Sequence, residues 1–227
     1  MTLPKPYYQD SAVTLYHGDA REIVPLLGRF DLLLTDPPYG INYVVKAGIV
    51  GRGNRRVMMG GKPPIFGDDK PFDPAPFLDC GEWVIMFGGN FYADKLPASG
   101  GWLVWDKTGG GRGPHNNFAD LEIAWSNLGK QPQIFHHLWK GLVRDSEAGE
   151  TVLHATQKPL ELMRWCLMEA DRANGEPVNT VLDPFAGSGT TGRACKDLGR
   201  KCVMIEREER YCEIAANRMG QEVLDFT

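Results

Sequence analysis

The chain has 227 residues, of which 42% are hydrophobic and 24% charged, and its net charge is −4. This composition is that of a globular domain rather than of a disordered chain, and the length favours one domain over two. The negative balance excludes binding of nucleic acid through overall charge, so any such site must be a local basic surface.

Cysteines and hydrophobic runs give two further expectations. The five cysteines form no CxxC pair and have no histidine nearby at zinc-ligand spacing, so we expect reduced thiols and no metal site. No stretch has the apolar core of a signal peptide or approaches the ~20 apolar residues of a membrane span. We therefore expect a cytoplasmic protein without membrane contact.

The first elements predicted along the chain are a strand and a helix. Residues 13–16 have the pattern of a short strand, and residues 20–27 have that of a helix. Asp19 precedes the helix and is of a residue type that caps helix N-termini. We expect the carboxylate to cap this helix.

The next strand ends at Asp36-Pro37-Pro38-Tyr39. Residues 31–35 are an apolar run with the length of a buried strand, so the motif lies at a strand's carboxyl end, where open α/β sheets place their chemistry. Asp36 and the Pro37 carbonyl can each accept a hydrogen from an exocyclic amine, and the Tyr39 ring can stack on a planar base. The motif predicts a pocket for an amino-bearing heterocycle; the alternative is a Pro-Pro turn with a helix-capping aspartate.

A basic, glycine-rich stretch follows this motif. Residues 41–66 contain no Asp or Glu, and a segment of this length without predicted structure is usually functional or disordered. Its positive residues are Lys46, Arg52, Arg55, Arg56 and Lys62. We expect a loop on the substrate side; the alternative is a solvated loop.

The middle of the chain predicts four strands and contains further candidate nucleic-acid contacts. The strands are residues 83–87, 102–105, 121–125 and 134–140, with a short helix near 91–96. Adjacent histidines on a strand point to opposite faces, so His136 and His137 are expected at the surface or facing nucleic acid, rather than on one metal. The residues predicted to contact nucleic acid here are Lys107, Arg112, His136, His137, Lys140 and Arg144; the alternative for the glycine-rich residues 106–115 is a plain flexible connection.

The last third of the chain predicts a ligand-binding turn. Helix 158–170 leads to strand 178–182, the motif Asp183-Pro184-Phe185-Ala186-Gly187-Ser188-Gly189-Thr190-Thr191-Gly192 and helix 190–198. Glycines allow the backbone to approach a ligand closely. The spacing also fits a dinucleotide fingerprint, but Asp183 stands where it can meet a cationic ligand, which counts against NAD. Strand 202–205 and helix 208–219 end the predicted fold.

In combination, these motifs resemble the amino-methylating DNA methyltransferases that use S-adenosylmethionine. Asp36-Pro37-Pro38-Tyr39 before Asp183–Thr191 corresponds to the circularly permuted order of the β class. Gly18-Asp19, Glu206 and His154–Pro159 fit the same family, although Ala155 stands where the family usually has proline. The resemblance covers nearly the whole chain.

The resemblance implies a fold and an arrangement of strands. We expect an α/β, Rossmann-like methyltransferase fold, circularly permuted, with a mostly parallel sheet containing an antiparallel strand. Residues 1–227 would form a single domain with DNA-contacting insertions at about 41–75 and 106–150. The strands before Asp183 and Glu206 would lie between those that lead to Asp19 and Asp36.

The resemblance also implies roles for residues. Asp36, Pro37, Pro38 and Tyr39 would bind the target amine, with Asp36 ionised near its ordinary pKa of ~3.9. The residues expected to contact DNA are Arg52, Arg55, Arg56, Lys62, Lys107, Arg112, His136, His137, Lys140 and Arg144. The residues expected at the cofactor are Asp19, Asp36, Thr156, Gln157, Lys158, Asp183, Pro184, Phe185, Ala186, Gly187, Ser188, Gly189, Thr190 and Glu206.

The expected reaction is transfer of a methyl group to adenine N6 in double-stranded DNA after base flipping. An aspartate that opens the tetrad is associated in this family with adenine, and cytosine N4 is the nearest alternative. RNA and protein-glutamine methyltransferases share a similar tetrad, usually beginning with Asn, and a binding module would lack the acid or the glycines. A homodimer and a cognate restriction endonuclease are expected partners.

Overall fold

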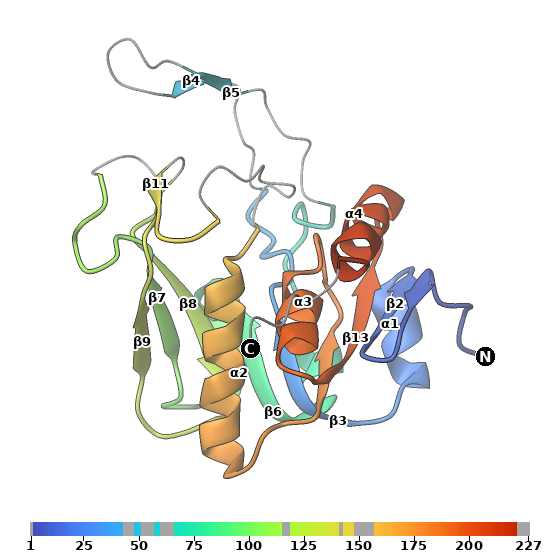
Figure 1. Ribbon diagram of the computed structural model, residues 1–227. Coiled ribbons are helices and arrows are strands. Elements are labelled where there is room, and N and C mark those ends of the chain that lie inside the picture. Colours follow the sequence, from blue (N-terminus) through green and yellow to red (C-terminus); the bar gives the residue numbers. More distant parts are fainter. Residues whose placement is uncertain are drawn as a thin grey trace, which may run out of the picture.

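The structure, a computed structural model, describes residues 2–42, 48–50, 57–59, 66–114, 119–140, 143–147 and 157–221. A nine-stranded sheet runs through these residues (Figure 1). In spatial order its strands are β1 (Tyr8–Gln9), β2 (Val13–His17), β13 (Lys201–Glu206), β12 (Thr180–Asp183), β3 (Phe30–Thr35), β6 (Gly81–Phe87), β8 (Leu121–Ser126), β7 (Leu103–Asp106) and β9 (Gln133–His136).

Most neighbouring strands in this sheet are parallel. β8 runs antiparallel to β6 and β7, and β1 runs antiparallel to β2, whereas every other neighbouring pair is parallel. The predicted α/β fold with a mostly parallel sheet is confirmed, and β1 is a reversed strand in addition to β8. β13 and β12 lie between β2 and β3, as expected.

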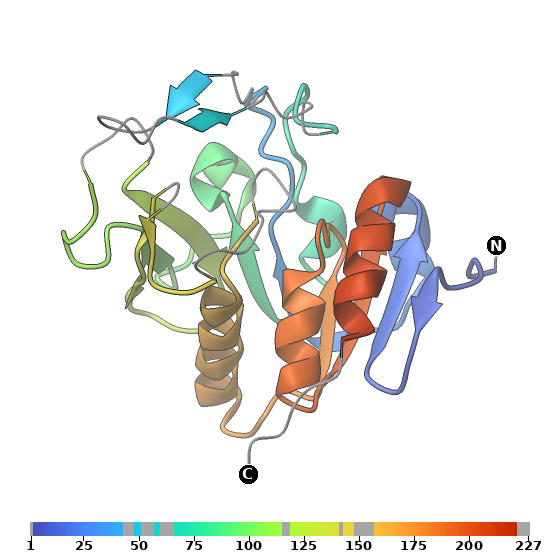
Figure 2. The ribbon, with the colours of Figure 1, turned by 45° about the horizontal axis from the view of Figure 1, so that its top comes forward.

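The sheet is buried on both faces. Leu32 and Leu34 of β3 belong to a core shared with α2 (Leu160–Asn174), α3 (Thr190–Asp197) and α4 (Glu209–Met219), which lie side by side on one face (Figure 2). Leu33 belongs to a second core on the other face, with α1 (Ala20–Ile23) and η2 (Ala75–Phe77). Because side chains alternate along a strand, this two-sided burial requires the unbroken apolar run of β3.

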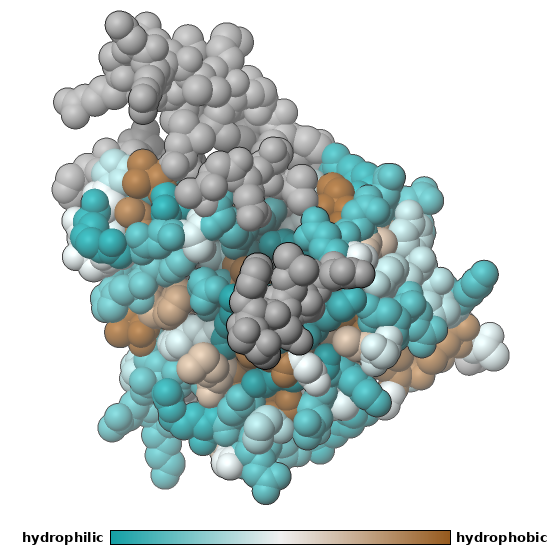
Figure 3. Space-filling view, viewed as in Figure 1, coloured by the Kyte–Doolittle hydropathy of each residue, from teal (hydrophilic) through white to brown (hydrophobic). Residues whose placement is uncertain are grey.

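One face of the molecule has the surface of an ordinary globular protein (Figure 3). The face shown in Figure 3 is mainly hydrophilic, and its exposed hydrophobic residues lie in small separate groups. No helix in the described part of the chain is long and apolar enough to cross a membrane. The five cysteines are free thiols, four of them buried.

Two predicted helices are shorter or tighter than expected. The helix expected over 20–27 is α1 followed by a 3-10 turn, η1 (Val24–Leu26), with a proline in its first turn. The helix expected near 91–96 consists of two 3-10 turns, η3 (Gly89–Phe91) and η4 (Ala93–Lys95). Both segments connect strands over a short path, where i to i+3 hydrogen bonds are common.

The single strand expected over 134–140 is wrong. β9 ends at His136, and β10 (Trp139–Lys140) pairs with β11 (Val143–Arg144) in a separate hairpin. The Leu138 backbone N–H donates to the Asp145 carboxylate at 2.9 Å, which draws the chain out of the sheet.

The basic stretch is not without secondary structure. The paired antiparallel strands β4 (Gly48–Val50) and β5 (Val57–Met59) lie in it, so the expectation of a structureless loop is wrong for these residues.

Candidate active site at the carboxyl edge of the sheet

Chemically active residues collect at one edge of the sheet. Because β2, β13, β12 and β3 are parallel, their carboxyl ends meet at the same edge (Figure 1). Asp19 follows β2, Glu206 ends β13, Asp183 ends β12 and Asp36 follows β3. Four carboxylates from distant parts of the sequence thus stand along one edge, which is where open α/β sheets bind ligands.

A pocket joins the two main sequence motifs. Asp36 lines it from the strand β3 side, and the other lining residues come from the start of α2 and from the glycine turn. Those residues are Gln157, Lys158, Met163, Phe185, Ala186, Gly187, Ser188, Thr190 and Thr191. The predicted substrate motif and the predicted cofactor turn therefore open onto the same space.

The glycine turn needs its glycines. Gly187 and Gly189 have φ values of 52° and 77°, in the left-handed region that side chains disfavour. A Cβ on Gly189 would also lie 2.9 Å from the Cβ of Ala215 on α4. The turn can therefore pass close to α4 only with glycine at position 189.

Glu206 holds this turn in place. Its Oε2 accepts the Gly187 backbone N–H at 2.8 Å, and its Oε1 accepts that of Glu208 at 2.7 Å. Burial raises the pKa of the Glu206 carboxyl, although these backbone donors act in the opposite direction. The carboxylate fixes the turn and retains lone pairs for a ligand hydroxyl.

Asp183 is a strongly perturbed carboxyl at the pocket. It is buried, and its Oδ1 accepts the Thr35 hydroxyl at 2.7 Å and the Phe185 backbone N–H at 3.2 Å. Burial raises its pKa to about 6, against the effect of these donors. Loss of a proton near neutral pH makes this side chain a suitable partner for a cationic ligand group.

Asp36 belongs to a chain of alternating charges. Its Oδ1 accepts the Tyr39 hydroxyl at 2.5 Å, and its Oδ2 contacts the Lys158 ammonium. Lys158 Nζ lies 3.2 Å from Glu122 Oε2, and Glu122 Oε1 accepts from Lys107 Nζ at 2.6 Å. Sequence reasoning missed Glu122, because it belongs to no motif; the signal was a carboxylate within the otherwise apolar run of residues 121–125.

The pKa of Asp36 differs from the expected ordinary value. Burial raises it, and the neighbouring Glu122 raises it further, whereas Lys158 lowers it. The net shift is upward, so the expectation of an unperturbed carboxyl is wrong. Removal of the carboxylate from water has a larger effect than its ion pair.

Tyr39 lies in an aromatic pair. Its ring stacks on that of Phe91, with a centroid distance of 5.1 Å and an interplanar angle of 18°. Phe91 is 50% exposed, so an aromatic surface lies next to Asp36 and open to solvent. Phe91 was not predicted as a site residue, because it lies in a 3-10 turn outside the motifs.

The close packing of Gly88 on Tyr39 gives a prediction. Gly88 has a φ of 74°, and a Cβ there would overlap the Tyr39 ring carbons Cδ1 and Cε1. We expect Gly88→Ala to displace the ring and reduce activity at this site at least tenfold. Gly175→Ala is the matched control, because Gly175 has a φ of 80° with open space around it. Equal activity of the two variants would show that the position of Tyr39 does not matter.

Asp19 is the cap that the sequence predicts. Its Oδ1 accepts the Arg21 backbone N–H at 2.9 Å at the start of α1, and its Oδ2 pairs with Arg207 at 3.0 Å. Arg207 directly follows Glu206, so the two carboxylates stand near each other at the edge.

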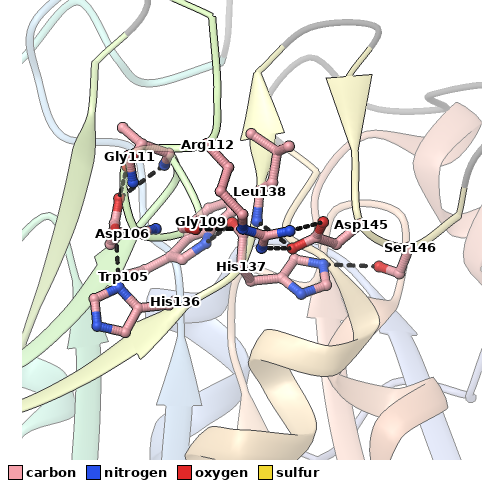
Figure 4. A network of polar contacts seen from close by, with 12 residues as sticks. Trp105, Asp106, Gly109, Gly111, Arg112, His136, His137, Leu138, Asp145 and Ser146 are labelled. Atoms are coloured by element: carbon pink, nitrogen blue, oxygen red, sulfur yellow. Dashed lines mark hydrogen bonds and ion pairs between the residues drawn. The ribbon is translucent and has the colours of Figure 1, made fainter.

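Three residues predicted to face DNA are engaged within the protein. The His137 ring is buried, stacked on Phe135, and its Nε2 contacts the Ser146 hydroxyl at 2.8 Å (Figure 4). The Lys140 ammonium is buried and bonded to Asp120, and Lys107 pairs with Glu122. The expected surface position of His137 is therefore wrong, because Phe135 and Trp139 enclose its ring.

Other predicted DNA residues remain accessible at this edge. His136 Nδ1 contacts Asp106 Oδ2 at 2.7 Å, and Arg112 pairs with Asp145 at 2.7 Å (Figure 4). The Arg144 guanidinium lies 4.5 Å from the centre of the Trp139 ring. Further predicted residues lie outside the described part of the chain: Arg52, Arg55, Arg56, Lys62 and Thr156.

The comparison with protein families defines the class of this chain. The model of the N6/N4 DNA methylase family matches residues 102–217, about half of the chain. The chain belongs to this DNA methylase family. The match includes the glycine turn, Glu206, Glu122 and Lys158.

Individual relatives extend this result. The type II methyltransferase M.ScaI of Streptomyces caespitosus is 28% identical over a 272-residue alignment that covers 97% of this chain and 85% of that protein. M.HinfI of Haemophilus influenzae is 39% identical over 82 residues, covering 36% of this chain and 21% of that protein.

Solved structures confirm the fold. A complex of M1.HpyAVI with SAM has a TM-score of 0.54 at 22% identity and covers 92% of this chain and 100% of that chain. The PvuII DNA methyltransferase, described as cytosine-N4-specific, has a TM-score of 0.59 at 17% identity and covers 97% and 91%. The fold is that of S-adenosylmethionine-dependent DNA methyltransferases.

Proposed function

We propose that this protein transfers a methyl group from S-adenosylmethionine to adenine N6 in double-stranded DNA, at a specific site. The observation that carries the proposal is the pocket shared by Asp36 and the glycine turn. Membership of the N6/N4 DNA methylase family and similarity to a type II methyltransferase support it.

The residues around the glycine turn fit S-adenosylmethionine. The buried Asp183 carboxylate suits the cationic amino-acid end, and the Glu206 carboxylate suits the two ribose hydroxyls. Asp19 pairs with Arg207, the residue after Glu206, and this ion pair places its carboxylate near that of Glu206. The expected contacts also include Thr156, Gln157, Lys158, Pro184, Phe185, Ala186, Ser188 and Thr190. When bound, the cofactor supplies an electrophilic methyl group on a sulfonium.

The Asp36 motif would activate the target amine. An adenine N6 lone pair is delocalised into the ring, so the amine is a poor nucleophile. Hydrogen bonds from the amine to Asp36 and to the Pro37 carbonyl favour a pyramidal nitrogen whose lone pair points at the methyl group. The Asp36 carboxylate also stabilises the positive charge that develops on the nitrogen. Pro38 keeps the turn rigid.

A paired base must leave the duplex to reach this motif, at a cost of a few kcal/mol. The aromatic pair Tyr39 and Phe91 offers a stacking surface beside Asp36, and such stacking recovers roughly 1–3 kcal/mol per base. Base flipping is therefore compatible with the open aromatic surface at this edge.

Cytosine N4 is the second candidate substrate. The cytosine-N4-specific PvuII enzyme has a similar fold. The exocyclic amine of cytosine has the same chemistry as that of adenine. We favour adenine because the tetrad opens with Asp36. Long-read sequencing of DNA from a methylation-deficient host that expresses this chain would reveal both the modified base and its sequence context. Unmodified host DNA would contradict the proposal.

The proposed architecture follows from the order of the motifs. The Asp36 motif precedes the glycine turn, the permuted order of the β class, and we infer a single domain over residues 1–227 with DNA-contacting insertions at about 41–75 and 106–150. A homodimer would enlarge the small DNA-binding surface. Similarity to a type II methyltransferase supports a role beside a cognate restriction endonuclease.

DNA affinity should depend on the basic stretch after the motif. We expect the combined change of Arg52, Arg55 and Arg56 to Ala to weaken DNA binding and to reduce the slope of log K against log salt by up to about 3. Fluorescence anisotropy at salt concentrations from about 50 to about 200 mM would measure this slope. An unchanged slope would exclude phosphate contacts by these arginines.

A further inference from the structure

Lys158 is a buried cation between two carboxylates. Its side chain is 6% exposed, and its ammonium contacts Asp36 Oδ2 and lies 3.2 Å from Glu122 Oε2. Asp36 follows β3 and Glu122 belongs to β8, so two strands hold the same lysine. An ammonium in this position has two alternative partners within a small movement.

Both oxygens of Asp36 are engaged in this arrangement. Oδ1 accepts the Tyr39 hydroxyl, and Oδ2 contacts Lys158. Under the proposed function, Asp36 must accept from the target amine and stabilise positive charge on it. A buried ammonium on the same carboxylate opposes that charge, because like charges in a region of low dielectric repel strongly. Lys158 must therefore move away from Asp36 before transfer.

Glu122 is prepared to receive the ammonium. Its Oε2 is buried and has no hydrogen-bond partner among the described residues, whereas its Oε1 is fixed by Lys107 at 2.6 Å. Although burial raises the pKa of Glu122, Lys158 and Lys107 hold it below the usual value, so the group is charged. A charged oxygen that lies 3.2 Å from the ammonium without a well-directed hydrogen bond is a second binding position for it.

We propose that Glu122 is a positioning residue that takes the Lys158 ammonium when the target amine binds Asp36. This inference rests on the proposed function and deepens it. This exchange leaves no buried charge without a partner. The target amine takes the place of the Lys158 ammonium at the Asp36 carboxylate, and the Glu122 carboxylate balances the charge of Lys158. An unpaired buried charge would otherwise oppose entry of the base.

The first test measures stability and requires no methyl transfer. Asp36→Asn and Glu122→Gln each leave Lys158 with one carboxylate, whereas the double variant leaves it with none. We expect the double variant to lower Tm by at least about 5 °C more than the sum of the single changes. In a Lys158→Met background this excess should disappear. Additive shifts in Tm in the wild-type background would overturn the proposal that the Lys158 ammonium can bind either carboxylate.

The second test measures transfer to unmethylated genomic DNA. We expect Glu122→Gln to lower kcat about tenfold while the Kd for S-adenosylmethionine stays within about twofold, and to have no further effect in a Lys158→Met background. Glu169→Gln is the matched control, since Glu169 is a carboxylate of α2 paired with Arg172 outside the pocket. It should leave kcat unchanged.

Three results would overturn the positioning role. The first is an equal loss from Glu122→Gln in the wild-type and the Lys158→Met backgrounds, because a purely structural role predicts it. The second is a Lys158→Met enzyme that binds S-adenosylmethionine with an unchanged Kd but shows no measurable transfer, because the lysine would then have an essential role beyond its ion pairs and its place in the cofactor pocket. The third is a loss in the Glu169 control. If the wild type itself transfers no methyl group, the proposed function fails, while the Tm cycle still decides whether Lys158 has two positions.

Discussion

Asp36→Ala should abolish methyl transfer, with a loss of at least about 10³-fold in kcat, while S-adenosylmethionine still binds. Cofactor binding should persist because Asp36 is one of several residues that line the pocket. Transfer should be lost because Asp36 is the only carboxylate of the Asp36-Pro37-Pro38-Tyr39 turn, where the amine is activated. Removal of a group that acts on developing charge lowers kcat more than affinity. Transfer of labelled methyl groups to DNA measures kcat, and calorimetry measures cofactor binding.

Asp36→Asn is the matched variant for this experiment, because it keeps the shape of the side chain and removes its charge. The same loss in the two variants would assign the effect to charge. Lys158 retains Glu122 as a partner in either variant, so the fold should persist. Normal turnover by Asp36→Ala would contradict the proposed mechanism.

Cofactor binding should weaken below about pH 6. Burial raises the pKa of Asp183 to about 6, so the side chain is mainly charged at pH 7 and mainly neutral at pH 5. The cationic ammonium of the cofactor stays charged over this range. The Kd should therefore rise up to about tenfold for each pH unit below 6, as a single titrating group requires. Calorimetry from pH 5 to 7 measures this dependence.

Two variants assign this pH dependence to its residue. Asp183→Asn should bind the cofactor weakly at every pH, with the transition near pH 6 removed. Glu206→Gln also weakens binding but should retain the transition, because Asp183 is intact. A transition that persists in Asp183→Asn would show that another group controls the affinity.

The main motifs could be predicted because they are local. The apolar run of β3, the rigid prolines after it and the glycine turn after β12 each specify their own backbone, and parallel strands bring their ends together. The order of β2, β13, β12 and β3 followed from the resemblance and is confirmed.

Other features depend on contacts between distant residues and could not be predicted. The break after β9 depends on Asp145, whose carboxylate takes the Leu138 N–H. The burial of His137 depends on Phe135, which stacks on Trp165 of α2. Single-residue patterns do not show which side chains a distant helix covers.

Charge pairing was the hardest feature to predict in the site. Lys107 and Lys140 are basic residues near a candidate DNA surface, yet both ammonium groups bind carboxylates of the protein. Glu122 and Phe91 lie outside every motif, and only the fold brings them to Asp36. Their positions follow from the pairing of β6 with β8 and from the 3-10 turn after β6.

Nucleoside mass spectrometry of unmethylated genomic DNA, incubated with the protein and methyl-labelled S-adenosylmethionine, would decide whether this pocket methylates DNA and at which base. We expect labelled N6-methyladenine, which is absent when Asp36→Ala replaces the wild type. Labelled N4-methylcytosine would support the same class of enzyme, with cytosine rather than adenine as the target base. No labelled nucleoside, with cofactor binding intact, would contradict the claim that this pocket methylates DNA.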